Sequence, residues 1–298
     1  MQAILSNHPT SAATPPALGC IAPIFRGPFL ERIARGAHVE ALLELADSLS
    51  HFRPPSRKDI LSDWFEFFYR LLLEKYRCEY VYKNAIATKL FLSRHSLHMS
   101  FMTDELRSAG SRADVAILNG TSTVYEIKTK YDSFDRLDAQ VLDYGKIFDR
   151  IYIVTTGPKV DLAMQALDPS VGIIAMRDNG ALGTIREALS NKQNVHPGAV
   201  FDCMRQGEFC AAVREARGFV PNVPNSQLYT KCREVFCSLS PAVAHDLMVR
   251  QVKKRGKGKA FVDLIDKAPP SLKHACLSFS RSVAMANAIT AKLQEPLI

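Results

Sequence analysis

The sequence predicts an α/β protein with a mixed sheet flanked by helices and a mainly α-helical C-terminal domain. Two observations support this class. Between residues 58 and 176 the apolar pattern runs in the order helix, strands, helix, strand, helix, strand. Beyond residue 192 the apolar residues recur mainly at helical spacing, and prolines divide the segment into short helices.

The N-terminal part is expected to be helical after a proline-containing lead over residues 1–25. Apolar positions at helical spacing predict helices over 29–49 and 58–76, the second with Ser56 as its N-cap. Residues 77–110 carry no clear periodicity and are expected to be irregular.

The central part contains the predicted sheet. Strands are expected over 111–118, 122–129, 150–155 and 171–176, and helices over 133–149 and 160–167. Asp132 or Ser133 is the expected N-cap of the first of these helices. The predicted domains are an N-terminal lead and helical segment (1–57), an α/β domain (58–191) and a basic helical domain (192–298).

Charge is distributed unevenly along the chain, whose formal net charge is +8. Residues 1–191 hold 22 basic and 22 acidic side chains, whereas residues 192–298 hold 16 and 8. A one-sided basic excess is typical of proteins that bind a polyanion such as nucleic acid. A solubilising surface on a helical domain explains it equally well.

Composition predicts a cytoplasmic protein without a membrane partner. Hydrophobic residues make up 47% of the chain, but no apolar run approaches the roughly 18 residues that span a bilayer. The first basic residue is Arg26, so no basic region precedes an apolar export signal. An odd number of cysteines, seven, fits reduced thiols better than disulfides. The absence of a Walker or G-x-G-x-x-G motif argues against ATP-driven activity.

The predicted hairpin over 112–129 brings candidate catalytic residues together. Asn119-Gly120 is a strong turn signal between two apolar runs. If the loop has an odd number of residues centred on Gly120, Asp114 lies opposite Glu126 and shares a face with Glu126 and Lys128. A two-residue loop would instead put the two carboxylates on opposite faces.

Two carboxylates at one end of a sheet can hold Mg²⁺ or Mn²⁺ through hard oxygen ligands. Such a metal polarises a phosphodiester and lowers the pKa of its bound water. Lys128 can orient that water or stabilise charge that builds up on the phosphate. A surface salt bridge between Lys128 and a carboxylate is the alternative explanation of the same pattern.

The spacing Asp-x11-Glu-x-Lys on a predicted hairpin followed by a helix resembles the PD-(D/E)xK nuclease superfamily. Within that superfamily, the segments 104–107, 111–115 and 125–128, and the following pattern from Asp132 to Tyr144, resemble the sce7726 family. This similarity covers roughly residues 60–190. It implies a restriction-endonuclease-like fold for residues 58–191, with Asp114 and Glu126 as metal ligands and Lys128 as the catalytic lysine.

The resemblance also suggests further site residues. Glu105 matches an acidic position of the family and is a candidate catalytic residue and ligand, and a solvated loop charge is the alternative. Glu66, on the preceding predicted helix, competes for the acidic position that many of these nucleases place there. Gln140 and Tyr144 lie on one helical face and resemble the Gln-x3-Tyr motif of RecB-like nucleases, which contacts DNA.

Basic residues complete the candidate substrate site. Arg112 lies opposite Lys128 in the odd-loop register. Lys253, Lys254 and Arg255 belong to a basic run with interleaved glycines, which suits contacts to phosphates that do not read sequence. A solvated loop is the alternative explanation of that run.

The predicted function is a Mg²⁺-dependent nuclease that hydrolyses phosphodiester bonds in DNA, with Mn²⁺ as an alternative metal. A second hypothesis is a catalytically silent nucleic-acid-binding or regulatory protein on the same fold. A third is a component of a phage-defence or mobile-element system whose activity requires a partner protein. A homodimer is left open.

Overall fold

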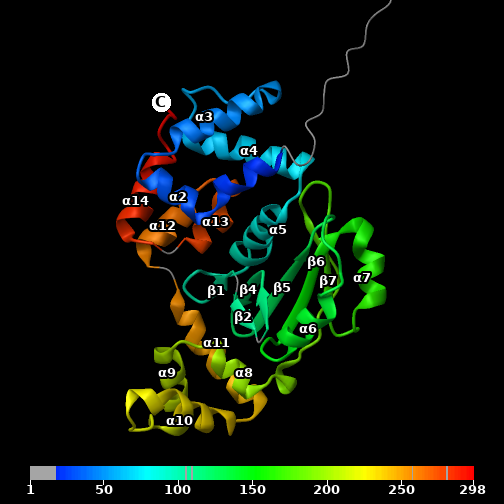
Figure 1. Ribbon diagram of the computed structural model, residues 1–298, viewed down its shortest axis with the longest axis vertical. Helices are drawn as coiled ribbons and strands as arrows, with labels where there is room; N and C mark the ends of the chain where they lie inside the picture. Colours follow the sequence, from blue (N-terminus) through cyan, green and yellow to red (C-terminus); the bar gives the residue numbers. More distant parts are fainter. Residues whose placement is uncertain (1–17, 105, 109, 257, 280) are drawn as a thin grey trace, which may run out of the picture.

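Six strands form one mixed sheet in the order β1-β4-β5-β6-β7-β8 (Figure 1). The computed structural model describes residues 18–104, 106–108, 110–256, 258–279 and 281–298. The strands of the sheet are β1 (Phe101–Thr103), β4 (Val115–Leu118), β5 (Ser122–Lys128), β6 (Arg150–Thr156), β7 (Gly172–Met176) and β8 (Leu182–Arg186). Strands β5, β6 and β7 are parallel, and the other pairs are antiparallel. A separate antiparallel pair consists of β2 (Leu106–Ser108) and β3 (Ser111–Ala113).

Helices cover both faces of the sheet. Two helices follow strands of the sheet: α6 (Leu137–Gly145) and α7 (Val160–Ala166). The N-terminal helices are α2 (Gly27–Ala34), α3 (Val39–Ser48), α4 (Leu61–Lys75), α5 (Glu79–Ala85) and the π-helix η3 (Ile86–Leu92). The C-terminal helices are α8 (Pro197–Asp202), α9 (Gln206–Arg217), α10 (Asn225–Cys237), α11 (Pro241–Val252), α12 (Lys259–Lys267), α13 (Lys273–Ser278) and α14 (Val283–Lys292). The α/β class with a mixed sheet and a helical C-terminal part is confirmed.

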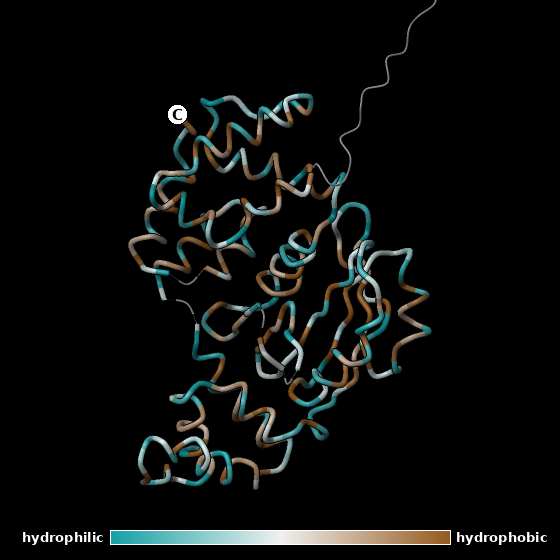
Figure 2. Tube along the Cα trace, viewed as in Figure 1, coloured by the Kyte–Doolittle hydropathy of each residue, from teal (hydrophilic) through white to brown (hydrophobic). Residues whose placement is uncertain are grey.

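The alternation of side chains along the strands divides the core into two clusters. On one face, Tyr125, Ile127 and Val154 pack with helices α2–α5 and α12–α14. On the other face, Val124 and Ile153 pack with α6 and with α8–α11. The strands are accordingly among the most hydrophobic segments in Figure 2. Because both faces are covered, the central strand β5 is buried along its whole length.

Residues 192–298 pack in two places. Helices α8–α11 join the cluster on the α6 face, at the lower end of the molecule in Figure 1. Helices α12 and α14 pack with each other and α14 packs against α2, in the N-terminal helical layer. The C-terminal segment therefore contributes to both cores, although its apolar pattern is helical throughout.

Residues near the end of the chain cap the N-terminus of α4, for which Ser56 was the predicted N-cap. The backbone N–H groups of Leu61 and Ser62 donate to the carbonyl oxygens of Glu295 (2.9 Å) and Leu293 (3.1 Å). These bonds satisfy N–H groups that a helix leaves without an internal partner. The predicted Ser56 cap is wrong because the helix begins five residues later, where a distant segment supplies the acceptors.

The helix predicted over 133–149 begins only at Leu137, and its N-cap is Arg136 rather than Asp132 or Ser133. The carboxylate of Asp132 instead accepts hydrogen bonds from the N–H (2.8 Å) and hydroxyl (2.7 Å) of Thr129. Asp132 thus closes the turn after β5 and is not available as a helix cap.

Several regular segments were not predicted. The segment 77–110, expected to be irregular, contains α5, η3 and the short strands β1 and β2. Strand β8 was also missed, because its residues are partly exposed at the sheet edge and lack an apolar run. No helix of the described residues is long and apolar enough to cross a membrane. Within the same residues, no disulfide links any of the cysteines.

Gly172 at the start of β7 has no room for a side chain. A Cβ there would lie 2.4 Å from ring carbons of Tyr152 and 2.8 Å from the backbone nitrogen of Ala188. We expect Gly172→Ala to lower the free energy of unfolding by about 1–3 kcal/mol, because neither the packed ring nor the backbone can move freely. Gly207→Ala, in open space on α9, is the matched control and should not destabilise the protein. Urea denaturation of both variants measures the difference, and equal stabilities would contradict the prediction.

Candidate active site

The hairpin of β4 and β5 has the register that the odd-loop hypothesis requires. Leu118 lies opposite Ser122, which leaves a three-residue loop centred on Gly120. Gly120 has a φ of 110°, a conformation that glycine adopts without steric cost. Continuing this register by one residue beyond β4 places Asp114 opposite Glu126, on the face that α6 covers.

Glu126 lies at the centre of a buried polar network, with only 3% of its surface exposed. One carboxylate oxygen, Oε1, accepts a hydrogen bond from the Gln140 amide (2.5 Å) and lies 3.0 Å from Lys128 Nζ. The other, Oε2, lies 2.5 Å from the Tyr144 hydroxyl. Three different side chains therefore hold this carboxylate in one orientation.

Lys128 is similarly buried, at 6% exposure. Its ammonium group donates to Gln140 Oε1 (2.8 Å) in addition to its ion pair with Glu126. Gln140 thus bridges the two charged groups, because its carbonyl accepts from the lysine while its amide donates to the glutamate. The ion pair between Lys128 and a carboxylate that was considered as an alternative is present, but it is buried and does not lie on the surface.

Asp114 occupies the bend between β3 and β4 and approaches Glu126 from the neighbouring strand. Its Oδ2 accepts a hydrogen bond from the backbone N–H of Ile127 (2.7 Å). Burial and, second, the charge of Glu126 raise the pKa of Asp114 to about 7, although the Ile127 N–H acts in the opposite direction. The two carboxylates therefore repel each other in a poorly hydrated place, despite the presence of Lys128.

Tyr144 connects helix α6 to strands β3 and β5. Its hydroxyl lies 2.8 Å from the carbonyl oxygen of Arg112 as well as beside Glu126. Burial and the adjacent Glu126 charge raise the pKa of Tyr144, so the phenol remains a hydrogen-bond donor. The Arg112 side chain is exposed next to this contact. The structure thus brings Asp114 together with Glu126, Lys128, Gln140 and Tyr144. The predicted single strand 111–118 is wrong, because it divides at Asp114 into β3 and β4, and Arg112 pairs with Arg107 of β2 instead of lying opposite Lys128.

Asp114 and Glu126 fit a hard divalent cation in charge and in donor chemistry. A cation between them would counteract the burial and the repulsion by Glu126 that together raise the pKa of Asp114. No group of three or more histidine, cysteine, aspartate or glutamate side chains converges on one point among the described residues. Two carboxylates with water and substrate oxygens are nevertheless a usual set of ligands for Mg²⁺.

The family described as Bacteriophage P4 protein cII matches residues 73–267, more than half of the chain. This chain belongs to that family. A curated relative, Protein cII of Enterobacteria phage P4, is 25% identical over 152 residues, which are 48% of this chain and 54% of the relative. The chain therefore spans about half the length of the curated relative that it matches.

A solved structure, the SPO1766 protein of unknown function from Silicibacter pomeroyi, is 24% identical and covers 34% of this chain and 67% of its own. Its TM-score is 0.27, which is too low to support a common fold. The family match includes both strands of the hairpin and α6, so the polar network lies within the part of the chain shared with the cII family.

Of the two further acidic candidates in this cII-family chain, Glu66 does not join the network. Glu105 lies outside the described residues. Glu66 accepts a hydrogen bond from the backbone N–H of Ser271 (2.8 Å), which belongs to the helical layer and not to the sheet. Glu66 therefore holds the C-terminal helices against α4.

The basic run is partly used for internal contacts. Arg255 donates to both oxygens of Glu208 (2.5 and 2.6 Å) and is largely buried. Lys254 is exposed and donates to Gln251 (2.8 Å), while Lys253 is half-buried. Arg255 thus attaches this segment to α9, which leaves Lys254 as the more accessible cation of the three.

Helix α5 adds two charged residues that the sequence analysis missed. Glu79 and Lys83 form an ion pair (2.7 Å), and both influence the pKa of Asp114, in opposite directions. Burial alone would lower the pKa of Lys83, but the charges of Asp104 and Glu79 outweigh it and raise the value. The Glu-x3-Lys spacing indicates a helical pair and could have revealed this helix.

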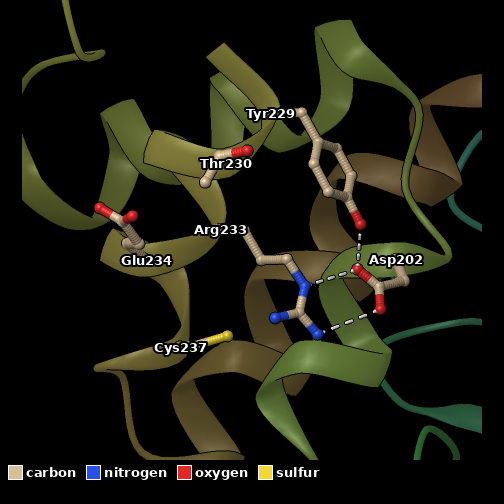
Figure 3. Close-up of a pocket in the computed structure, with 6 residues that line it drawn as sticks. All are labelled: Asp202, Tyr229, Thr230, Arg233, Glu234 and Cys237. Atoms are coloured by element: carbon tan, nitrogen blue, oxygen red, sulfur yellow. Dashed lines mark hydrogen bonds and ion pairs between the residues drawn. The ribbon is translucent and has the colours of Figure 1, made fainter. Parts of the chain in front are cut away.

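A separate hollow of about 580 Å³ lies between α8 and α10 (Figure 3). The carboxylate of Asp202 accepts hydrogen bonds there from Tyr229 (2.6 Å) and from Arg233 (2.9 Å). Asp202, Tyr229 and Arg233 therefore satisfy one another, and the two carboxylates that lie together at Asp114 and Glu126 have no counterpart in the lining of this hollow.

Proposed function

We propose that this chain is a metal-dependent nuclease that hydrolyses phosphodiester bonds in DNA. The observation that supports the proposal most directly is the convergence of Asp114, Glu126 and Lys128 on one face of a buried hairpin. The proposal includes a restriction-endonuclease-like fold and membership of the PD-(D/E)xK superfamily, within which the chain resembles the sce7726 family. Reduced cysteines are consistent with a cytoplasmic location, which we propose with it.

Asp114 and Glu126 would hold Mg²⁺, or Mn²⁺, at the end of the hairpin. When bound, the metal would supply a polarised phosphate and a water of lowered pKa. Lys128 would stabilise negative charge on the phosphate. Its ammonium lies beside the metal ligand Glu126 and is shielded from solvent, which strengthens its electrostatic interactions. Gln140 and Tyr144 would keep the carboxylate of Glu126 oriented through their hydrogen bonds.

A catalytically silent protein on the same scaffold, which binds nucleic acid or regulates another component, is the second candidate. It is favoured by the saturation of Glu126, whose two oxygens are both engaged by neighbouring side chains. A site of this kind is stable without a metal and could serve recognition alone. Activation by a partner protein, as in a phage-defence or mobile-element system, would require that partner to loosen the network.

The test is a cleavage assay on linear duplex, circular and single-stranded DNA with Mg²⁺, Mn²⁺ or EDTA. We expect cleavage with metal and none with EDTA. Glu126→Gln should reduce the rate about 10³-fold, since several kcal/mol of transition-state stabilisation depend on the metal. Glu234→Gln, an equal charge change on the exposed surface of α10, is the control and should retain full activity.

Cleavage that persists in EDTA or in Glu126→Gln would refute the site. DNA binding without cleavage under all metal conditions would favour the silent alternative. Cleavage that appears only after a cell extract is added, and that Glu126→Gln abolishes, would favour activation by a partner.

A further inference from the structure

A second cavity, of about 440 Å³, lies at the carboxyl ends of the parallel strands. Thr156 ends β6, and Lys130 follows β5 by two residues. The opposite wall comes from the N-terminal helices, with Lys75 at the end of α4 and Tyr82 on α5. Ligands of open α/β sheets commonly bind at this edge, and the volume lies in the range of small-molecule sites.

Two of the residues that line this cavity carry a buried hydroxyl group without a hydrogen-bond partner. Tyr82 is 0% exposed and Thr156 is 8% exposed, and neither hydroxyl oxygen has a partner within the part of the chain that the structure describes. A buried hydroxyl without a partner destabilises the folded state. Burial raises the pKa of Tyr82 to about 12, so its phenol is a donor at neutral pH. Both groups are therefore suited to donate to an acceptor that enters the cavity.

The charges around the cavity favour an anion. Lys75, Lys130 and Lys159 line it, together with Arg77. Arg77 forms an ion pair with Asp178 at 3.0 Å, so these two charges offset each other, and the three lysines face one remaining acidic residue of the lining, Glu74. Lys159 also donates to the carbonyl oxygen of Thr129 (2.9 Å), which fixes it beside the end of β5.

The cavity and the candidate active site flank the same strand ends. Lys130 follows Lys128 by two residues, which corresponds to about 7 Å along an extended chain. Thr155 donates to the carbonyl oxygen of Lys128 (2.7 Å), and Thr156 is its neighbour on the opposite face of the sheet. A strand of nucleic acid that crosses this edge could contact both places.

We propose that this cavity binds a phosphate group, which accepts hydrogen bonds from Tyr82 and Thr156 and is matched in charge by Lys75, Lys130 and Lys159. Phosphate oxygens accept hydrogen bonds and carry negative charge, which complements the lysines around the cavity. If the proposed function holds, this phosphate belongs to the DNA strand and lies close to the phosphate whose ester bond is cleaved. The same chemistry would accept the phosphate of a small ligand.

Two conservative variants test the hydroxyl groups. Tyr82→Phe and Thr156→Val remove only atoms that have no partner in the protein, so the melting temperature should stay equal or rise. The dissociation constant of a fluorescent oligonucleotide, measured by anisotropy in EDTA to prevent cleavage, should increase about tenfold in each. Unchanged affinity for both the oligonucleotide and inorganic phosphate would overturn the proposal.

The charge contribution is tested with the double variant Lys75→Gln/Lys130→Gln. It should weaken oligonucleotide binding about tenfold and flatten the dependence of affinity on salt. The double variant Lys231→Gln/Lys292→Gln removes two exposed lysines elsewhere and should bind like the wild-type protein. Equal losses in the two double variants would show a general charge effect and would overturn the proposal.

Comparing ligands shows whether the phosphate in the cavity belongs to DNA or to a small ligand. Protection against thermal unfolding by inorganic phosphate or a nucleoside monophosphate, lost in Tyr82→Phe while oligonucleotide affinity is unchanged, would support the phosphate site and assign it to a small ligand. Weaker oligonucleotide binding in the cavity variants would support the DNA assignment even if the wild-type protein cleaves nothing. If the cavity variants cleave DNA, bind the oligonucleotide and are protected by phosphate like the wild-type protein, while Glu126→Gln loses cleavage, the phosphate site is refuted and the nuclease site remains intact.

Discussion

Replacing Lys128 with methionine is expected to abolish cleavage and to destabilise the protein at the same time. The ammonium group lies 3.0 Å from Glu126 Oε1 in a buried network. Its removal leaves the Glu126 carboxylate buried beside Asp114 without its cation. Breaking a buried ion pair by removing one partner costs about 3–5 kcal/mol, and we expect a loss of that size in urea denaturation with EDTA.

A double variant separates the two roles of Lys128. Lys128→Met/Glu126→Gln removes both charges, so most of the lost stability should return, while cleavage should remain absent. The difference from the sum of the single variants measures the coupling between the pair. Lys128→Arg keeps the charge with a different geometry and should retain more stability than Lys128→Met. A loss of less than about 1 kcal/mol in Lys128→Met would show that the pair does not stabilise the fold in the way its burial indicates.

Asp114→Asn is expected to inactivate the protein but to stabilise it at alkaline pH. The pKa of Asp114 is raised to about 7 by burial and by Glu126, whereas an unfolded aspartate has a value of about 3.9. The folded state therefore retains a proton that the unfolded state has lost. The stability associated with this group is fully present below about pH 4 and is lost as pH rises through 7.

The asparagine side chain does not titrate, and its amide oxygen can still accept a hydrogen bond from the Ile127 N–H. The advantage of Asp114→Asn over the wild-type protein should therefore grow by about 2–3 kcal/mol from pH 5 to pH 8 in EDTA. Added Mg²⁺ at pH 8 should stabilise the wild-type protein and not the variant. Asp263→Asn, on the exposed side of α12, is the control. Parallel stability curves of Asp114→Asn and the wild-type protein between pH 5 and pH 8 would contradict the assigned shift.

The hairpin shows how far local sequence information reaches. Asn119-Gly120 and the alternation of apolar residues on either side were enough to predict the turn and the face that Glu126 shares with Lys128, but they left open the loop length that decides whether Asp114 lies opposite Glu126. The spacing of Gln140 and Tyr144 was also sufficient to predict that they share one helical face at the site, because α6 follows β5 in the chain. Each of these inferences depends on residues close together in the chain, where backbone geometry leaves few alternatives.

Long-range contacts account for the errors. The N-terminus of α4 is capped by carbonyl groups of residues 293 and 295, and no local pattern near Ser56 can reveal an acceptor so distant in sequence. Helix α5 lacks a side-chain cap, and its buried aromatic residues face neighbours from the sheet and the C-terminal helices. Arg255 belongs to a basic run in the sequence, but its side chain forms an ion pair with Glu208 on another helix.

The sequence by itself determined the α/β class and the face that Glu126 shares with Lys128, since strand alternation is a local property. It left two registers of the hairpin open, and the structure has the three-residue loop that places Asp114 opposite Glu126. Only the tertiary structure decided the charge environment of those residues. The raised pKa of Asp114, the saturation of Glu126 and the unpartnered hydroxyls of Tyr82 and Thr156 depend on burial between segments far apart in the chain. Burial and electrostatic interaction are properties of the assembled neighbours, and they become defined only when α4, α5, α6 and the sheet pack together.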